Sequence, residues 1–318
     1  MPRRRLPWRT LAAAMVTLVI LGVVYRRFGV SQDLLRVALH ARASWLAVAL
    51  GAIALCTAVT AERWRLVLGG MGHAVRWSRA LAAVLATAPL ATITPTRTND
   101  LLRPLALREV PLEVGAASVV AEKVVDLAVL LLLAACGALL ARMWLVGSAL
   151  AAMLCAMVGA VWLALSGRMA WFSALPLKRG WAERIERGAR ALELLKGKPG
   201  RLVAVATASL TIRLLTVVVG QALLVAVGSD VRWWQTLAVW PTAILVSLLP
   251  VTLGGAGTRD AAFLWLLSTS GVTVDADSVL AATLGYWVLA FAVPALVGLP
   301  FMMRAAVTAS VRSPSGNV

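Results

Sequence analysis

Long apolar runs separated by short charged segments dominate the chain. Each run approaches or exceeds the ~20 residues that a helix needs to cross a lipid bilayer. Trp45 and Trp144 stand near the ends of two runs, as expected for amphipathic rings at a membrane–water interface. The pattern therefore predicts six full crossings, at residues 11–25, 44–61, 116–140, 144–165, 202–227 and 279–303.

Two further apolar stretches, 80–110 and 235–270, are interrupted in the middle by polar residues and by proline or glycine. The interruptions fall at residues 94–100 and 250–260. Broken apolar helices inside a membrane are tolerated where the freed backbone is buried in protein or lines a cavity. We therefore expect two re-entrant helical hairpins, each returning to the side from which it entered.

The two interrupted stretches resemble copies of one another. Residues 75–82 align with residues 231–238 at an offset of 156, with identity at Val, Arg, Trp, Leu and Ala. Farther along, Pro95 corresponds to Pro250 and Asp100 to Asp260. This predicts an internal duplication, a common origin of transporter folds.

Charge in the loops predicts the orientation. The segment 168–201 carries nine Lys and Arg against three Glu, so the positive-inside rule makes it cytoplasmic, like the basic N-terminus. Four full crossings separate these two segments, which makes the two hairpins enter from opposite sides, as an inverted repeat. Arginines 26, 27, 36 and 42 in the expected outer loop run against this orientation.

The expected fold is therefore an all-α polytopic membrane protein with about six full crossings and two broken hairpins in an inverted repeat. It lies in the cytoplasmic (inner) membrane with both termini cytoplasmic. Its divisions are an N-terminal helix and loop at 1–43, repeat 1 at 44–167, an amphipathic connector at 168–201, repeat 2 at 202–303 and a disordered tail at 304–318.

Composition excludes several classes of function. With 61% hydrophobic and 14% charged residues, the 318-residue chain has too much apolar surface for a soluble domain. The net charge of +17 sits mostly between apolar runs, where it suits topology and anionic lipid rather than nucleic acid. Three cysteines in apolar runs and two loop histidines form no metal spacing and no nucleophile set. We expect no metal, no cofactor and no enzymatic activity.

Ionisable residues inside apolar segments are the candidate functional groups, since each costs ~2.5–3.5 kcal/mol to insert at bilayer depth. Thr98 or Asn99 could cap a helix before Asp100, and Thr258 could do so before Asp260; free N–H groups at such helix starts attract anions. The anion-binding candidates are Arg97, Asn99, Arg103, Gly254, Gly255, Gly257 and Arg259. The candidates for charge balance or proton coupling are Asp100, Glu122, Lys123, Asp126, Arg213 and Asp260. Purely structural ion pairs that lock the hairpins together are the competing interpretation.

At these residues the chain resembles the lysylphosphatidylglycerol synthase transmembrane-region family, also described as flippase-like membrane proteins. The family patterns P-x-R-x-G-E-x-x-R, E-R-x-x-D and P-x-x-x-G-G-x-G-x-R-E correspond to residues 95–103, 122–126 and 250–260. Residues 62–68 are similar to the family's R-W-R-x-L-L segment. Here Asn replaces Gly at position 99, Asp replaces Glu at 100 and 260, and Lys replaces Arg at 123.

The resemblance implies lipid handling. Two-part relatives join this membrane region to a soluble aminoacyl-transferase domain, which this sequence lacks, so we expect no synthase activity. The leading hypothesis is a protein that binds an anionic lipid headgroup, of a phospholipid or a polyprenyl-phosphate-linked sugar, and translocates it. Two alternatives stay open: an accessory or scaffold subunit that partners envelope-biosynthesis enzymes, and a membrane-embedded transferase using the carboxylates as acid and base.

Overall fold

The computed structural model describes residues 39–92, 98–107, 109–165, 199–248, 257–269 and 275–310, and the regular structure in these ranges is helical. Five helical segments are long and apolar enough to cross a membrane: Ala43–Gly70, Leu112–Leu140, Trp144–Leu163, Pro199–Ala226 and Ala276–Ala305. They coincide with five of the six predicted runs, which confirms a helical, multi-pass membrane protein. The sixth run, 11–25, lies outside the described residues.

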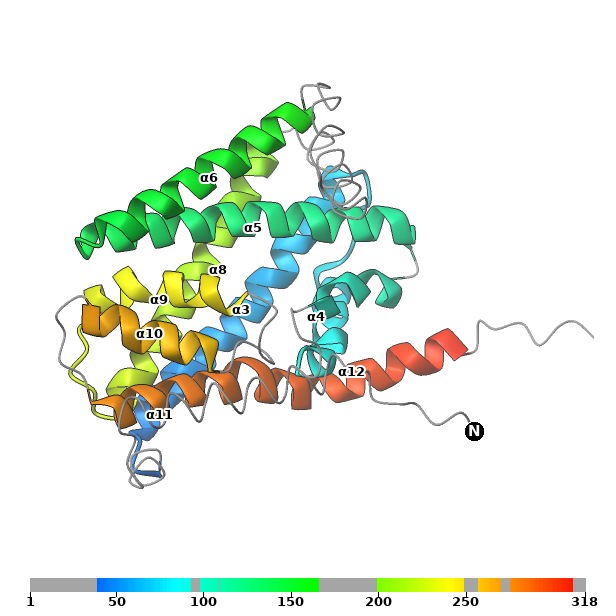
Figure 1. Ribbon diagram of the computed structural model, residues 1–318. Helices are drawn as coiled ribbons and strands as arrows, with labels where there is room; N and C mark the ends of the chain where they lie inside the picture. Colours follow the sequence, from blue (N-terminus) through cyan, green and yellow to red (C-terminus); the bar gives the residue numbers. More distant parts are fainter. Residues whose placement is uncertain are drawn as a thin grey trace, which may run out of the picture.

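Two equally long helices cross at the centre of the molecule. Helix α3 (Ala43–Gly70) and helix α8 (Pro199–Ala226) each have 28 residues, and they pack along one another (Figure 1). The thiol of Cys56 in α3 donates to the carbonyl of Ile212 in α8 at 3.8 Å, and these two residues are 156 positions apart. The duplication offset seen in the sequence therefore also relates the two central helices.

Further helices flank this central pair on two sides (Figure 1). On one side α5 (Leu112–Leu140) and α6 (Trp144–Leu165) form an antiparallel pair. On the other side a continuous helical segment comprises α11 (Ala276–Trp287), the π-helical turn η4 (Val288–Ala292) and α12 (Val293–Ser310). Such π-helical turns inside longer helices are frequent at functional sites.

Shorter helices fill the spaces beside the central pair. Helix α4 (Trp77–Ala91) is followed by the 3₁₀ helix η1 (Thr98–Ala106), and helix α9 (Trp233–Ser247) is followed by α10 (Thr258–Thr269). The α4 and α9 arms have 15 residues each, roughly 22 Å, which is too short to span the hydrocarbon core. They lie on opposite sides of the α3/α8 pair in Figure 1. The residues that join the arms, 93–97 and 249–256, lie outside the described ranges.

Glycines let each short arm pack directly against a long helix of the other half. A Cβ atom on Gly137 of α5 would lie 2.3 Å from the carbonyl oxygen of Ala238 in α9. A Cβ on Gly298 of α12 would lie 2.2 Å from the carbonyl oxygen of Leu85 in α4. Small residues at such crossings are the usual means by which membrane helices approach closely. The two arms are thereby fixed on opposite flanks of the central pair.

Two predicted boundaries differ from the observed helices. Helix α12 continues to Ser310, so residues 304–310 are helical although we expected the disordered tail to begin at 304. The apolar character of 305–307 allows the helix to extend beyond the last predicted crossing. Helix α8 begins at Pro199, inside the expected connector, since proline suits the first turn of a helix. The rest of that connector lies outside the described residues.

Candidate functional site

Helix α5 presents two carboxylates to the interior, one turn apart. Glu122 is fully buried and accepts hydrogen bonds from Arg63 at 2.5 Å and from Arg103 at 3.2 Å. Asp126 accepts from Arg63 at 3.0 Å and from Nε of Arg213 at 3.1 Å. Their spacing of four residues places both on one face of the helix, so Arg63 of α3 can bridge them.

A third carboxylate extends this set towards the first hairpin. Asp100 of η1 accepts a hydrogen bond from Arg103 at 2.6 Å and forms an ion pair with Lys123 of α5. The contacts form a continuous series of alternating charges, which we call the buried charge network: Lys123, Asp100, Arg103, Glu122, Arg63, Asp126 and Arg213.

The buried charge network contains more cations than anions. Four basic side chains meet three carboxylates, which leaves one formal positive charge when every group is ionised. All members except the half-exposed Lys123 are buried. The three buried arginines balance the three carboxylates, so the surplus positive charge belongs to Lys123, which lines the cavity and attracts an anionic partner there.

Two of the guanidinium groups retain hydrogen-bonding capacity. Within the part of the chain that the structure describes, Nε of Arg63 and Nε of Arg103 are buried donors without an acceptor. Buried donors are normally satisfied. A phosphate oxygen would satisfy these two N–H groups once the side chains around them move enough to admit it.

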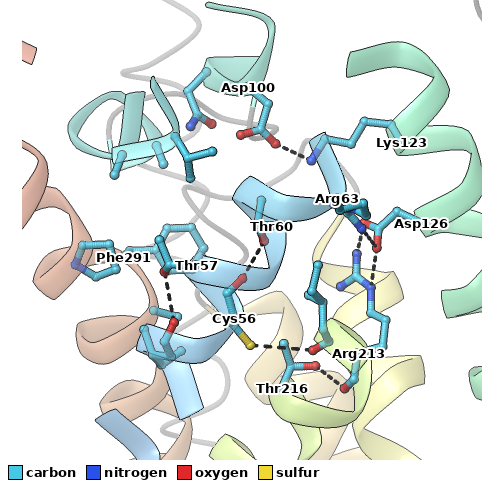
Figure 2. Close-up of a pocket in the computed structure, with 18 of the residues that line it drawn as sticks. Cys56, Thr57, Thr60, Arg63, Asp100, Lys123, Asp126, Arg213, Thr216 and Phe291 are labelled. Atoms are coloured by element: carbon cyan, nitrogen blue, oxygen red, sulfur yellow. Dashed lines mark hydrogen bonds and ion pairs between the residues drawn. The ribbon is translucent and has the colours of Figure 1, made fainter. Parts of the chain in front are cut away.

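A cavity of about 330 Å³ lies against the buried charge network. Figure 2 shows Arg63, Lys123, Asp126 and Arg213 on one side of it and Asp100 at its end. The walls come from the central helices α3 and α8, from α4 and η1, from α5, from the end of α9 and from the α11–α12 segment. The apolar part of its lining includes Ile53, Val84, Leu85, Leu127, Ile212, Leu248, Phe291 and Pro294.

Three threonines form a neutral polar face of the same cavity (Figure 2). The hydroxyl of Thr57 donates to the carbonyl of Ile53 at 3.0 Å, and that of Thr60 donates to the carbonyl of Cys56 at 2.7 Å. In α8 the hydroxyl of Thr216 donates to the carbonyl of Arg213 at 2.7 Å. While each hydroxyl proton is donated to the helix, the lone pairs of each oxygen remain to accept a hydrogen bond from the cavity.

The charged residues at the start of α10 pair with each other. Arg259 is almost fully buried and donates to the adjacent Asp260 at 2.9 Å and to the carbonyl of Thr283 at 2.6 Å. Asp260 also accepts from the backbone N–H of Gly257 at 2.9 Å, and Gly257 has a φ of 84°, a conformation that favours glycine. The Arg259 guanidinium lies 4.7 Å from the ring centroid of Tyr286. Tyr286 lines the cavity, whereas Arg259 is not one of the lining residues.

The structure thus brings six sequence candidates into one network: Asp100, Arg103, Glu122, Lys123, Asp126 and Arg213. Asn99 also lines the cavity, and its Nδ2 donates to the carbonyl of Thr87 at 3.2 Å. Of the two caps that we predicted, Thr98 or Asn99, the structure excludes Asn99, because η1 begins at Thr98 and Asn99 lies within its first turn. Its buried Oδ1 has no donor among the described residues. Arg259 and Asp260 form the separate pair described above, and Arg97, Gly254 and Gly255 lie outside the described ranges.

Sequence reasoning missed Arg63 as a site residue, although it contacts two of the three carboxylates. The predicted crossing ended at residue 61, whereas α3 continues to Gly70, so Arg63 lies within a helix rather than in a loop. Its neighbour Trp64 is fully buried and donates to the Ser118 hydroxyl at 2.9 Å. The fit of residues 62–68 to the family's R-W-R-x-L-L segment was the available signal.

The fold is that of a polytopic helical membrane protein. Its polar site is the buried charge network beside the cavity, between the candidate membrane-spanning helices. Residues 10–298 match the family model of the lysylphosphatidylglycerol synthase TM region, so the chain belongs to that family, as the resemblance predicted. Membership associates it with lipid or cell-envelope biosynthesis at the membrane. A comparison with curated proteins gives no match.

Proposed function

We propose that this chain binds the anionic headgroup of a lipid in the cavity beside the buried charge network and moves that lipid across the cytoplasmic membrane. The observation that carries the proposal is a cavity between candidate membrane-spanning helices, lined by four basic side chains, two of which hold an unsatisfied buried N–H donor. A lipid phosphate supplies both the negative charge and the acceptor oxygens that this site lacks.

The apolar part of the lining supports a lipid rather than a free anion. The acyl or polyprenyl chains of a lipid would stay in contact with apolar side chains and the surrounding bilayer while the phosphate enters the site. Arg63, Arg103, Lys123 and Arg213 would hold the phosphate, and the three carboxylates would balance these charges when the cavity is empty. Asp100 or Asp126 could also carry a coupled proton, since each faces the cavity.

An inverted repeat would provide the means of movement. The α4 and α9 arms begin 156 residues apart and lie on opposite flanks of the α3/α8 pair. In transporters with this arrangement, one repeat rocks against the other around a fixed central site. We propose that the cavity opens alternately towards the two leaflets in this way, with the 168–201 connector and both termini on the cytoplasmic side and no enzymatic step involved.

The test is a headgroup-accessibility assay in proteoliposomes that contain a fluorescent anionic lipid. Wild type is expected to expose inner-leaflet lipid to an external quencher faster than empty liposomes do. Lys123→Gln and Arg63→Gln/Glu122→Gln are expected to lose most of this acceleration. The double variant removes a cation and an anion together, so it avoids leaving either buried charge alone.

Arg65→Gln is the matched control. Arg65 stands two residues from Arg63 on the same helix, but it pairs with Glu62 at 2.6 Å and is substantially exposed. Its variant is expected to match wild type. If folded wild type accelerates exposure of no lipid, translocation is wrong. Product formed from a lipid and a sugar or aminoacyl donor would instead support a transferase, and loss of function only on deletion of 180–196 would support a scaffold.

A further inference from the structure

From the cavity lining we infer that the headgroup bound here is a phosphate carrying hydroxyl groups, and that lipids whose headgroup bears an amino-acid ammonium are rejected. This inference deepens the proposed function and rests on it. It concerns the chemistry of the headgroup, which the family name alone would assign to a lysyl ester.

Charge around the cavity argues against a cationic headgroup. The lining contains four basic side chains but only two carboxylates, Asp100 and Asp126. Each of these carboxylates already contacts two cations: Asp100 contacts Arg103 and Lys123, and Asp126 contacts Arg63 and Arg213. The third carboxylate, Glu122, is fully buried behind the lining. An ammonium entering the cavity would therefore meet a positive surplus and would have to displace an existing ion pair to gain a carboxylate.

Hydroxyl groups on the ligand match the threonine face. The oxygens of Thr57, Thr60 and Thr216 are acceptors towards the cavity, because their protons are donated to helix carbonyls. A ligand that brings neutral donors matches this face without breaking these bonds. Glycerol and sugar hydroxyls are such donors, whereas the phosphate itself brings only acceptors.

The position of the threonines relative to Arg63 fits one continuous headgroup. Thr57, Thr60 and Arg63 follow at intervals of three residues on α3, which places them roughly 4.5 and 9 Å apart along the helix axis. Figure 2 shows all three on the side of α3 that faces the cavity. If Arg63 holds the phosphate, a glycerol or one sugar ring attached to that phosphate can reach the hydroxyl oxygens of Thr57 and Thr60.

The test is a binding titration on purified full-length protein, read by native mass spectrometry, with lipids of identical acyl chains. Phosphatidylglycerol, lysylphosphatidylglycerol and phosphatidylmethanol share one phosphate and differ in hydroxyls and ammonium. We expect phosphatidylglycerol to bind at least about tenfold more tightly than lysylphosphatidylglycerol, and about fivefold more tightly than phosphatidylmethanol, the effect of one net hydrogen bond. A polyprenyl phosphate with and without a sugar forms a second matched pair and distinguishes the two lipid sources.

Variants tie these preferences to the cavity. Thr57→Val/Thr60→Val keeps the shape of the side chains and is expected to bind phosphatidylglycerol and phosphatidylmethanol equally. Thr211→Val is the matched control, because its exposed hydroxyl makes the same bond to a carbonyl four residues earlier without lining the cavity. Equal or tighter binding of lysylphosphatidylglycerol would overturn the inference while leaving lipid binding intact. If no lipid binds more tightly to wild type than to Arg63→Gln/Glu122→Gln, the proposed function is wrong as well.

Discussion

The two halves of the molecule share a helical plan but differ in where their charges make contacts. Helices α3 and α8 have the same length at a 156-residue offset, and so do α4 and α9. At that offset Arg63 of α3 corresponds to Val219 of α8, and Arg213 of α8 corresponds to Thr57 of α3. The lengths of these helices recur at this offset, whereas the charged residues do not.

The two hairpin arginines illustrate the difference most clearly. Arg103 and Arg259 are also 156 residues apart. Each pairs with a nearby aspartate, Asp100 or Asp260. Arg103 also pairs with Glu122 on another helix and faces the cavity, whereas Arg259 also donates to the Thr283 carbonyl and lies against the Tyr286 ring outside the cavity lining. The segment with Arg103 therefore contributes charge to the cavity, and the segment with Arg259 supports a residue of its wall.

Removing a carboxylate from each half gives the largest expected contrast. Asp260→Ala leaves the buried Arg259 without a carboxylate and with the Thr283 carbonyl and the Tyr286 ring, so it is expected to lower the free energy of unfolding by ~3–5 kcal/mol. Asp126→Ala leaves Arg63 paired with Glu122 and leaves Arg213 facing the cavity, so a smaller loss of ~1–3 kcal/mol is expected. Unfolding by SDS in mixed micelles measures both. Equal losses would show that the two charge sites are energetically equivalent.

The glycine contacts should behave alike in the two halves, because they serve the scaffold. Gly137→Ala and Gly298→Ala each place a Cβ against a backbone carbonyl of the packed arm, and each is expected to cost ~1–3 kcal/mol. Gly51→Ala in α3 is the control, since its Cβ would meet nothing within 4 Å, and it should be neutral or stabilising. The same unfolding assay compares the three. A harmless Gly298→Ala beside a harmful Gly137→Ala would contradict equivalent packing.

The smallest contrast concerns the start of the long helix in each half. Asp275 caps α11 by accepting from the backbone N–H groups of Asp277 and Ser278, whereas α5 begins after Pro111 with no side-chain cap. Asp275→Ala is therefore expected to cost ~1 kcal/mol in unfolding free energy.

Acid should abolish this difference. The Ser278 hydroxyl, together with the backbone N–H groups of Ser278 and Asp277, holds the pKa of Asp275 below its ordinary value. The stabilisation is therefore complete above the unfolded-state pKa of ~4 and is lost as pH falls through the lower folded-state pKa. Unfolding curves of wild type and Asp275→Ala should converge at acid pH; a gap that persists there would mean that the carboxylate charge does not matter.

Apolar periodicity alone predicted most of the scaffold, because a bilayer demands long uninterrupted apolar segments. The alignment of 75–82 with 231–238 likewise anticipated the parallel starts of α4 at Trp77 and α9 at Trp233. The ion-pair partner of each charged side chain could not be predicted in this way. Arg63 and Arg65 look alike in sequence, yet two residues of helix turn one side chain inward and the other outward. The contrasting contacts of Arg103 and Arg259 depend on which helix passes alongside, and local sequence does not encode that.

The π-helical turn at Val288–Ala292 determines how this part of the chain responds to the loss of a residue. Before it, α11 packs against α8 and α10; after it, α12 packs against α4. A π-helical turn holds one residue more than an α-helical turn, so deleting one residue here would restore α-helical winding and leave the downstream helix close to its present orientation. Gly298 would still face Leu85, and Pro294 would stay in the cavity wall. The segment 288–292 should therefore tolerate a single-residue deletion better than the α-helical stretch 293–298, where the same change would rotate the following residues by about 100°.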